Sequence, residues 1–197
     1  MAVTDKVDVR ARIVRDPDPE FDWDDYQEIF QMYTWHRRYQ LGPEHDYTRD
    51  EVRELFDNDR YYFFDLYMYE HGNIALSLSP FSCHWDSGVV GYIVASKDDL
   101  QTQFGFDLQD EDVVSKVKDF LESHLDECTS YINGEVYGVV VETRKRGDCE
   151  CCSRAFEWEK YDDCYGFFGV DPATNGLSQT IKDMTAHFDN VEVIDVV

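Results

Sequence analysis

Residues 81–87, Phe-Ser-Cys-His-Trp-Asp-Ser, hold side chains of the types that could do chemistry. A thiol, an imidazole and a carboxylate occur within four residues, and His71 precedes them across a predicted turn. A thiol nucleophile needs a nearby base and a group that orients the base. Cys83 with His71 or His84, oriented by Asp86, would supply these groups. The pattern therefore predicts a candidate catalytic or ligand-binding site.

A structural interpretation of the same residues competes with the catalytic one. In it, Cys83 and Trp85 fill the core, while Ser82, Asp86 and Ser87 close hydrogen bonds within turns. Cysteine is among the most frequently buried residue types, which favours this interpretation. We also find no glycine-rich phosphate loop and no metalloprotease or serine-hydrolase motif. The sequence therefore leans away from an enzyme.

The segments around this loop predict strands that would position it. Residues 61–69 are almost entirely aromatic or aliphatic, which is typical of a central strand covered on both faces. Gly72 and Asn73 favour a tight turn, and residues 74–79 alternate as a half-buried return strand. Residues 88–94 predict a third strand. The candidate site would thus lie between two paired strands.

The string HGNIALSLSPFSCHWDSGVVGYIVASKDD, residues 71–99, resembles a motif in uncharacterised proteins of phages and mobile elements. Those proteins carry an H-S-G-I turn followed by F-S-C-P-W-D-S-G-Q-V-G-F-I. Residues 131–138 and 163–169 are similar too, so the resemblance covers about residues 30 to 190. Here Gly72-Asn73 replaces the usual Ser-Gly, and His84 replaces the usual Pro. The resemblance implies a phage or mobile-element source and a host-cell cytoplasmic location, but no activity.

The charge of the chain is its strongest global feature. The 197 residues include 42 Asp and Glu against 18 Lys and Arg, a net charge of −24. Such a field repels nucleic acid and anionic membranes and attracts basic surfaces. A small domain needs a charge of only about 2–8 for solubility. Two explanations remain stronger: a surface that imitates DNA phosphates, and adaptation to a salty cytoplasm.

The first explanation, joined to the resemblance, predicts an acidic phage protein that inhibits a host defence or DNA-binding protein. Its partner would be a protein with a basic surface, without direct nucleic-acid binding or membrane association. Carboxylates on two predicted helices would replace phosphates. The predicted binding residues are Asp22, Asp24, Asp25, Glu28, Asp110, Glu111, Asp112, Asp119 and Glu122. The alternatives are the site at Cys83, His71 and Asp86, extended by Asp163 and Cys164, and a halophilic protein.

A cysteine-rich segment suggests a metal site only weakly. Cys149 and Cys152 form one C-x-x-C pair, whereas a structural zinc site usually has two such pairs. Cys164, or Cys83 with His84, would have to complete the site through space. We therefore predict no metal and no cofactor. Without a secretory signal the thiols should be reduced.

Residues 35–39, Trp-His-Arg-Arg-Tyr, form a basic aromatic patch. Arginines beside aromatic rings could bind a phosphate or stack on a base. In so acidic a chain, we predict instead that these arginines pair internally with carboxylates.

The remaining periodicities complete the predicted fold. Helices are expected at residues 21–33, 48–56, 110–128 and 171–188, and a short helical segment after Ser96. Further strands are expected at 6–14, 135–142 and 191–196, with a hairpin of 155–161 and 164–169 turning at 162–163. An Asn-Gly turn is expected at 133–134. This predicts one α+β domain over 1–197, with a mainly antiparallel sheet of six to eight strands and three or four packed helices.

Overall fold

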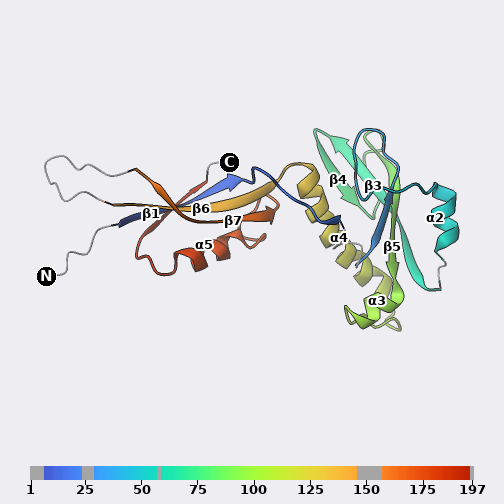
Figure 1. Cartoon of the computed structure of the whole chain (residues 1–197). Helices are drawn as coiled ribbons and strands as arrows, with labels where there is room; N and C mark the ends of the chain where they lie inside the picture. The colour runs from blue at the N-terminus through green and yellow to red at the C-terminus, as the bar shows by residue number, and fades with distance from the viewer. Residues whose placement is uncertain (1–6, 24–28, 57–58, 146–156, 196–197) are drawn as a thin grey trace, which may run out of the picture. The chain divides into compact units, whose positions relative to one another are not determined.

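The computed structural model describes residues 7–23, 29–56, 59–145 and 157–195 (Figure 1). These residues form eight strands and four helices in two mostly antiparallel sheets, so the predicted α+β class is confirmed. The strands divide equally between two sheets, where the sequence predicts a single one. By contacts the chain divides into two compact units, residues 1–20 with 134–197 (unit 1) and residues 21–133 (unit 2). This division does not test whether residues 1–197 fold as one domain, so that expectation stays a prediction.

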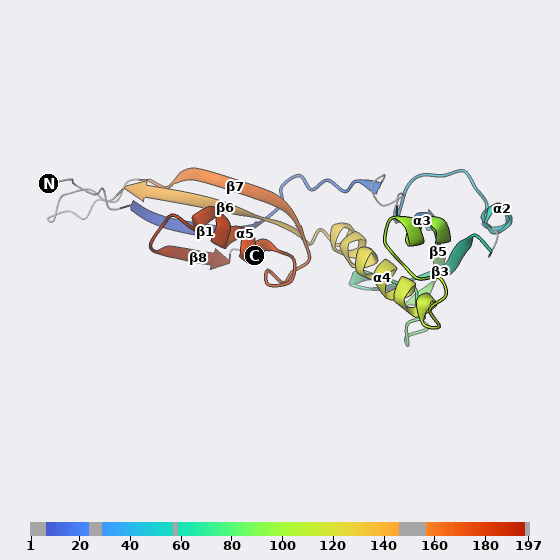
Figure 2. The same cartoon turned by 90° about the horizontal axis from the view of Figure 1, so that it is seen from below.

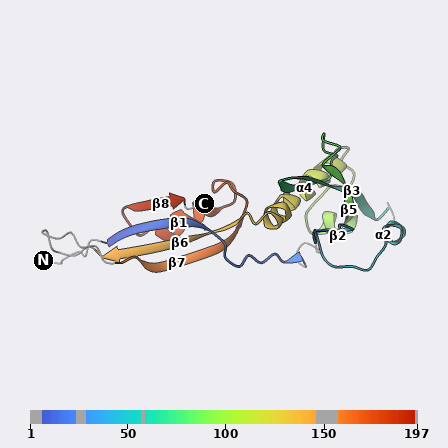
Figure 3. The ribbon, with the colours of Figure 1, turned by 90° about the horizontal axis from the view of Figure 1, so that it is seen from above.

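Unit 1 is built around a four-stranded sheet from both ends of the chain. Its strands, in spatial order, are β7 (Glu159–Phe168), β6 (Val136–Lys145), β1 (Val7–Arg15) and β8 (Val191–Asp195) (Figure 3). β6 pairs antiparallel with both β1 and β7, and β8 pairs parallel with β1. Unit 2 is therefore inserted into the sequence of unit 1, between β1 and β6.

Alternation along the strands of unit 1 creates one apolar face, because successive side chains point to opposite sides of a sheet. The helix α5 (Leu177–Thr185) covers that face (Figure 1). The buried side chains of this core are Val9, Ala11 and Ile13 on β1, Tyr137, Val139 and Val141 on β6, and Leu177 and Ile181 on α5.

Unit 2 contains the second sheet and the stretch that holds the candidate chemistry. Its strands, in spatial order, are β2 (Gln31–Thr34), β5 (Ser87–Ser96), β3 (Tyr61–His71) and β4 (Asn73–Ser77). Its helices are α2 (Arg49–Leu55), α3 (Lys97–Thr102) and α4 (Val113–Ile132). β3 is internal to the sheet, as its apolar sequence predicts.

The main core of unit 2 lies between the sheet and α4, while α2 lies on the other side of the sheet (Figure 1, Figure 2). Buried side chains on the α4 side include Leu66, Met68, Ile74, Leu76, Ile93, Val117, Leu121 and Leu125. Val52 of α2 is buried away from that core, as are Tyr92 and Val94 of β5. The two faces of this sheet therefore differ in what covers them.

α2 begins with the capping box that the sequence predicts. The Thr48 hydroxyl accepts a hydrogen bond from the backbone N–H of Glu51 at 3.3 Å. The Glu51 carboxylate accepts from the backbone N–H of Thr48 at 2.7 Å. These reciprocal bonds satisfy N–H groups that a helix start leaves unpaired, and they lower the pKa of Glu51.

Side chains of α4 protect the outer edge of β4. Backbone N–H groups of Ile74, Leu76 and Leu78 donate to Asn133 Oδ1, Thr129 Oγ1 and Glu122 Oε1 at 2.9, 3.3 and 3.0 Å, respectively. Asn133 also donates from Nδ2 to the carbonyl of Ile74 at 2.8 Å, so its amide imitates a neighbouring strand. An open edge strand is a template for aggregation, and these side chains occupy it.

Two local predictions are wrong. Residues 31–33, expected at the end of a helix, belong to β2, because pairing with β5 determines their conformation. Asp162 and Asp163, expected in a turn, lie inside β7, an edge strand whose side chains water can reach. Asn133 and Gly134 form the expected turn, which follows α4, and Gly134 has the left-handed φ of 68° that suits a helix C-terminus.

None of the helices in the described part of the chain is long and apolar enough to cross a membrane.

Candidate functional site

The acidic residues predicted to bind a partner lie mainly on and before α4. Asp110, Glu111 and Asp112 precede its first turn, and Asp119 and Glu122 lie within it. The buried residues Val113, Val117, Leu121, Leu125 and Cys128 define the face of α4 that packs on the sheet. Any acidic surface on α4 must therefore lie on the remaining helix faces.

Asp112, Asp119 and Asp126 form a line on the outer side of α4, which we call the aspartate stripe. They are seven residues apart, about two helical turns, and all three are exposed. At 3.6 residues per turn their direction is opposite the buried residues. A rise of 1.5 Å per residue separates successive members by about 10.5 Å. α4 thus presents carboxylates in an ordered row.

Two of the predicted residues are already engaged within unit 2. Asp110 forms an ion pair with Lys116 and accepts the backbone N–H of Asp112 at 2.8 Å, and together these interactions lower its pKa. Glu122 accepts from the Ser77 hydroxyl at 3.1 Å, besides capping the edge of β4. Both carboxylates therefore contribute to the fold, and a partner would compete for them.

Asp126 belongs to the aspartate stripe but was not among the predicted residues. The residue is exposed, but its carboxyl is partly desolvated, and this desolvation, more than the neighbouring Glu122, raises the pKa of Asp126. The seven-residue spacing from Asp112 and Asp119 is visible in the sequence and could have identified it.

The second predicted acidic group lies at the start of unit 2. Asp22 is exposed, ahead of Trp23, whose ring packs 4.5 Å from that of Phe21. Asp24, Asp25 and Glu28 lie outside the described residues.

Residues of the alternative site lie close together at the end of β3 and in the loop before β5. Asp86 Oδ2 accepts a hydrogen bond from Cys83 Sγ at 3.5 Å. The same oxygen lies 3.4 Å from His71 Nδ1. The backbone fixes this arrangement, because Glu70 N–H donates to the Asp86 carbonyl and Ser87 Oγ donates to the Cys83 carbonyl.

The order of groups in this cluster matters for its chemistry. In a thiol nucleophile the imidazole takes the thiol proton, and the carboxylate orients the imidazole. Here the carboxylate of Asp86 is central and contacts both the thiol of Cys83 and the ring of His71. The imidazole of His71 is 74% exposed. This arrangement differs from that of an activated thiol nucleophile, and it offers a carboxylate, a thiol and an imidazole to a small polar ligand.

The prediction that Cys83 and Trp85 fill the core is wrong. Trp85 is 96% exposed, and Cys83 is only partly buried. Their loop ends in the tight turn that the Ser87 hydroxyl closes, as the structural interpretation expects. The Trp85 side chain, however, is exposed to solvent.

The other predicted cysteine and carboxylate residues lie in unit 1 or outside the described residues. Asp163 and Cys164 lie on β7 in unit 1, where Asp163 accepts from Lys160 Nζ at 3.1 Å and Cys164 is paired in register with Val139. Cys149 and Cys152 lie outside the described residues. Among the residues that the structure describes, no three His, Cys, Asp or Glu side chains are placed to hold a metal ion.

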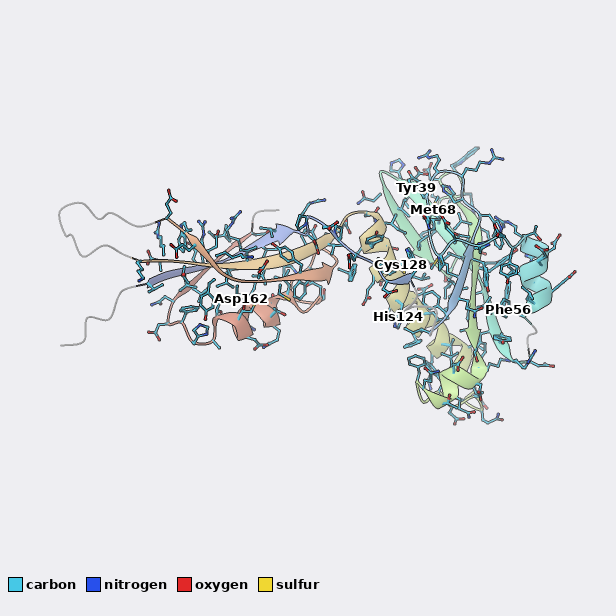
Figure 4. The ribbon with its side chains drawn as sticks, viewed as in Figure 1. Tyr39, Phe56, Met68, His124, Cys128 and Asp162 are labelled. Carbon is cyan, nitrogen blue, oxygen red and sulfur yellow. The ribbon has the colours of Figure 1, made fainter. Side chains whose placement is uncertain are left out.

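The basic aromatic patch pairs internally, as predicted for Arg38. Its guanidinium forms an ion pair with Glu70 and donates to Tyr39 Oη at 2.9 Å, while Tyr39 Oη donates to Glu70 at 2.8 Å. The ring of His36 stacks on Tyr39 at 5.2 Å (Figure 4 labels Tyr39). Arg37 is exposed and makes no ion pair with any described residue.

Sequence reasoning missed a further group on the α2 side of the sheet. Arg53, Phe56, Phe63 and Asp65 line a pocket of about 490 Å³. Phe63 and Asp65 share a face of β3, which alternation could have shown. Their proximity to α2 depends on tertiary packing.

Comparisons of the chain with protein-family models, with curated proteins and with solved structures found no match.

Proposed function

We propose that this chain is a protein-binding module that uses the aspartate stripe of α4 to occupy a basic, nucleic-acid-binding surface of its partner. The observation that supports the proposal most directly is the ordered row of Asp112, at the N-cap of α4, and Asp119 and Asp126, within α4. In keeping with the resemblance to phage proteins, the partner would be a host defence or DNA-binding protein in the host cytoplasm.

The charge of unit 2 supports the same proposal at longer range. Residues 21–133 contain 24 Asp and Glu against 8 Lys and Arg, a formal charge of −16. A field of this sign accelerates encounter with a cationic surface and repels polyanions. The field would bring the partner to unit 2, and the stripe would orient the contact.

The stripe imitates only part of a phosphate array. One carboxylate per ~10 Å along α4 is about sixfold sparser than duplex DNA, which has one charge per ~1.7 Å of axis. At physiological ionic strength the screening length is about 8 Å, so the stripe members act almost independently. We therefore expect a few discrete contacts with Arg or Lys, and binding that weakens with salt.

Affinity capture with stripe variants tests the proposal. The full-length chain, the variant D112N/D119N/D126N and a control variant E44Q/D46N/E54Q would each be immobilised and exposed to host lysate. Both variants lose three negative charges, but only the first changes α4. The expected result is a nucleic-acid-binding protein that is captured at low salt by the native chain and the control, and lost with the stripe variant.

The same comparison can contradict the proposal. If the stripe variant and the native chain capture one partner equally well, α4 is not the binding surface. If the stripe variant and the control weaken binding equally, only net charge matters, and the ordered row contributes nothing specific.

A second candidate function is favoured by the assembly of Cys83, Asp86 and His71 around one carboxylate oxygen. Such a cluster suits binding or proton transfer to a small polar ligand at the loop surface. Rapid and stoichiometric reaction of Cys83 with iodoacetamide, slowed by His71→Ala, would favour it. Reaction at the rate of an ordinary exposed thiol, unchanged in H71A, would count against it.

A further inference from the structure

A second site lies on the face of the unit 2 sheet that α4 does not cover. The pocket between α2 and β3 is lined by Arg53, Phe56, Phe63 and Asp65 and has a volume of about 490 Å³. We call it the α2 pocket. Ligand sites in proteins usually measure about 300–1,000 Å³ and combine aromatic walls with a few polar groups. The α2 pocket has this composition, and none of its residues belongs to the sites described above.

The aromatic walls of the α2 pocket are held from behind by other rings. Phe56, which ends α2, has its ring centroid 5.0 Å from that of Tyr61 and 5.8 Å from that of Tyr33. Phe63 lies 4.8 Å from Tyr92, which is 2% exposed. Ring contacts of this kind stabilise fixed orientations. The walls are therefore set before any ligand binds (Figure 4 labels Phe56 on the α2 side).

The two charged residues of the pocket have polar groups that are available to a ligand. The Arg53 guanidinium lies 5.0 Å from the centroid of the Tyr92 ring, a contact that leaves its N–H groups able to donate hydrogen bonds. Asp65 is exposed in the middle of β3. In the described part of the chain, neither side chain makes a hydrogen bond or an ion pair, and the two do not pair with each other. The pocket thus offers a ligand both the N–H donors of Arg53 and the carboxylate acceptor of Asp65.

These four side chains specify the chemistry of a ligand. Two aromatic walls favour a flat ring, because stacking of a base on an aromatic side chain is worth ~1–3 kcal/mol. The two oxygens of Asp65 suit two adjacent N–H donors, and the donor edge of Arg53 suits a carbonyl or a phosphate. Guanine carries adjacent ring and amino N–H groups on one edge and the acceptors O6 and N7 on another, whereas adenine and uracil lack that donor pair.

We propose that the α2 pocket binds a guanine base, supplied as the free nucleoside or the nucleoside monophosphate. Asp65 accepts the two N–H groups of its Watson–Crick edge, Phe56 and Phe63 stack on the ring, and Arg53 donates to an acceptor of the base or to the phosphate. The charge of −16 on unit 2 repels a polyphosphate chain, so the ligand is a single nucleoside and not a nucleic acid.

Titration calorimetry of the full-length chain tests this proposal. Guanosine and guanosine monophosphate would be titrated into the native protein, the variant Asp65→Asn and the control variant Glu54→Gln. Both substitutions remove one carboxylate from an exposed position of unit 2, but Glu54 does not line the pocket. The expected result is saturable binding by the native chain and E54Q, and binding about tenfold or more weaker by D65N, as loss of a two-point hydrogen bond predicts.

Two outcomes would overturn the proposal. One is no saturable heat with guanosine or its monophosphate at about 1 mM ligand, or equal affinity for the native chain and D65N. The other is equal affinity for guanosine, adenosine and uridine. That result would mean that stacking alone binds the base and that Asp65 does not distinguish guanine from the other bases. Circular dichroism of D65N, expected to match the native spectrum, separates lost binding from lost structure.

Discussion

At the scale of single residues, the cluster around Asp86 shows how little the presence of a thiol, an imidazole and a carboxylate determines. The sequence places these groups within hydrogen-bond reach of one another, and the structure confirms that proximity for Cys83, Asp86 and His71. The order in which they contact one another depends on hydrogen bonds from the Glu70 backbone N–H and from the Ser87 hydroxyl to carbonyls of the loop. These bonds are tertiary contacts, which residue spacing does not encode.

The cysteines of unit 2 should differ sharply in reactivity. Cys128 is fully buried in α4, and burial raises its pKa to about 12. Cys83 is only partly buried. We expect iodoacetamide to modify Cys83 in the native chain and to modify Cys128 only after denaturation, because the thiolate is the reacting species. Peptide mass spectrometry measures both, and modification of native Cys128 would contradict the packing of α4.

Two carboxylates near α4 should change stability in opposite directions when neutralised. Ion pairing with Lys116 lowers the pKa of Asp110, so its contribution is present at neutral pH and is lost as pH falls through its folded-state pKa. Burial raises the pKa of Asp126, so its charge opposes folding at neutral pH. We expect Asp110→Asn to destabilise and Asp126→Asn to stabilise the fold at about pH 7, and both differences to be smaller at about pH 3.

Urea denaturation at the two pH values measures these differences. Asp119→Asn is the matched control and should change stability little, because Asp119 is exposed on the same helix and makes no ion pair within the described residues. Equal effects of Asp110→Asn at neutral and acid pH would show that the hydrogen bond to Asp112, and not the ion pair, is what the substitution removes.

At the scale of elements, the protected edge of β4 gives the clearest energetic prediction. Asn133 both accepts from and donates to the backbone of Ile74. Replacing it with Ala leaves two backbone groups without their partner, at a cost of about 1–3 kcal/mol in the free energy of unfolding. Ser130→Ala is the control, because that hydroxyl bonds only to Asp126 within α4 and its loss should change stability by less than about 0.5 kcal/mol.

Much of this architecture can be predicted from local patterns, and the exceptions share a cause. β3, β5 and α4 are long and strongly periodic, so alternation or helical spacing identifies them. β2 has four residues and exists because Met32 pairs with Ile93. The α2 pocket brings Arg53 and Phe56 to Phe63 and Asp65 through packing of α2 on the sheet. Features made by contacts between elements leave no period in the sequence.

At the scale of the whole molecule, the charge of −24 should make stability depend on salt. Repulsion among carboxylates opposes the compact state, and salt screens it. We expect the melting temperature to rise steadily between about 0.02 and 0.5 M NaCl, with a folded protein throughout. Circular dichroism measures it. Loss of the folded signal below about 1 M salt would identify the chain as halophilic. A melting temperature independent of salt would contradict both salt adaptation and destabilisation by carboxylate repulsion.

The prediction of one domain can be tested by calorimetry. Each unit has its own buried cluster, one around β1 and β6 and the other between α4 and its sheet. One domain predicts a single unfolding transition with equal calorimetric and van't Hoff enthalpies. Two transitions would show that the units unfold independently. Leu121→Ala, which removes a fully buried side chain from unit 2 only, would then lower one transition and leave the other unchanged.

The insertion of unit 2 between β1 and β6 has a consequence for the order of events on the ribosome. All of unit 2 has been synthesised when residue 133 is added, whereas β1 pairs with residues 137–145 and with β8 near the end of the chain. The alternating apolar side chains Val9, Ala11 and Ile13 cannot pack against β6 and α5 until residues 136–185 have been synthesised. If unit 2 folds first, it shortens the flexible segment between β1 and β6. The entropic cost of pairing these two strands then falls.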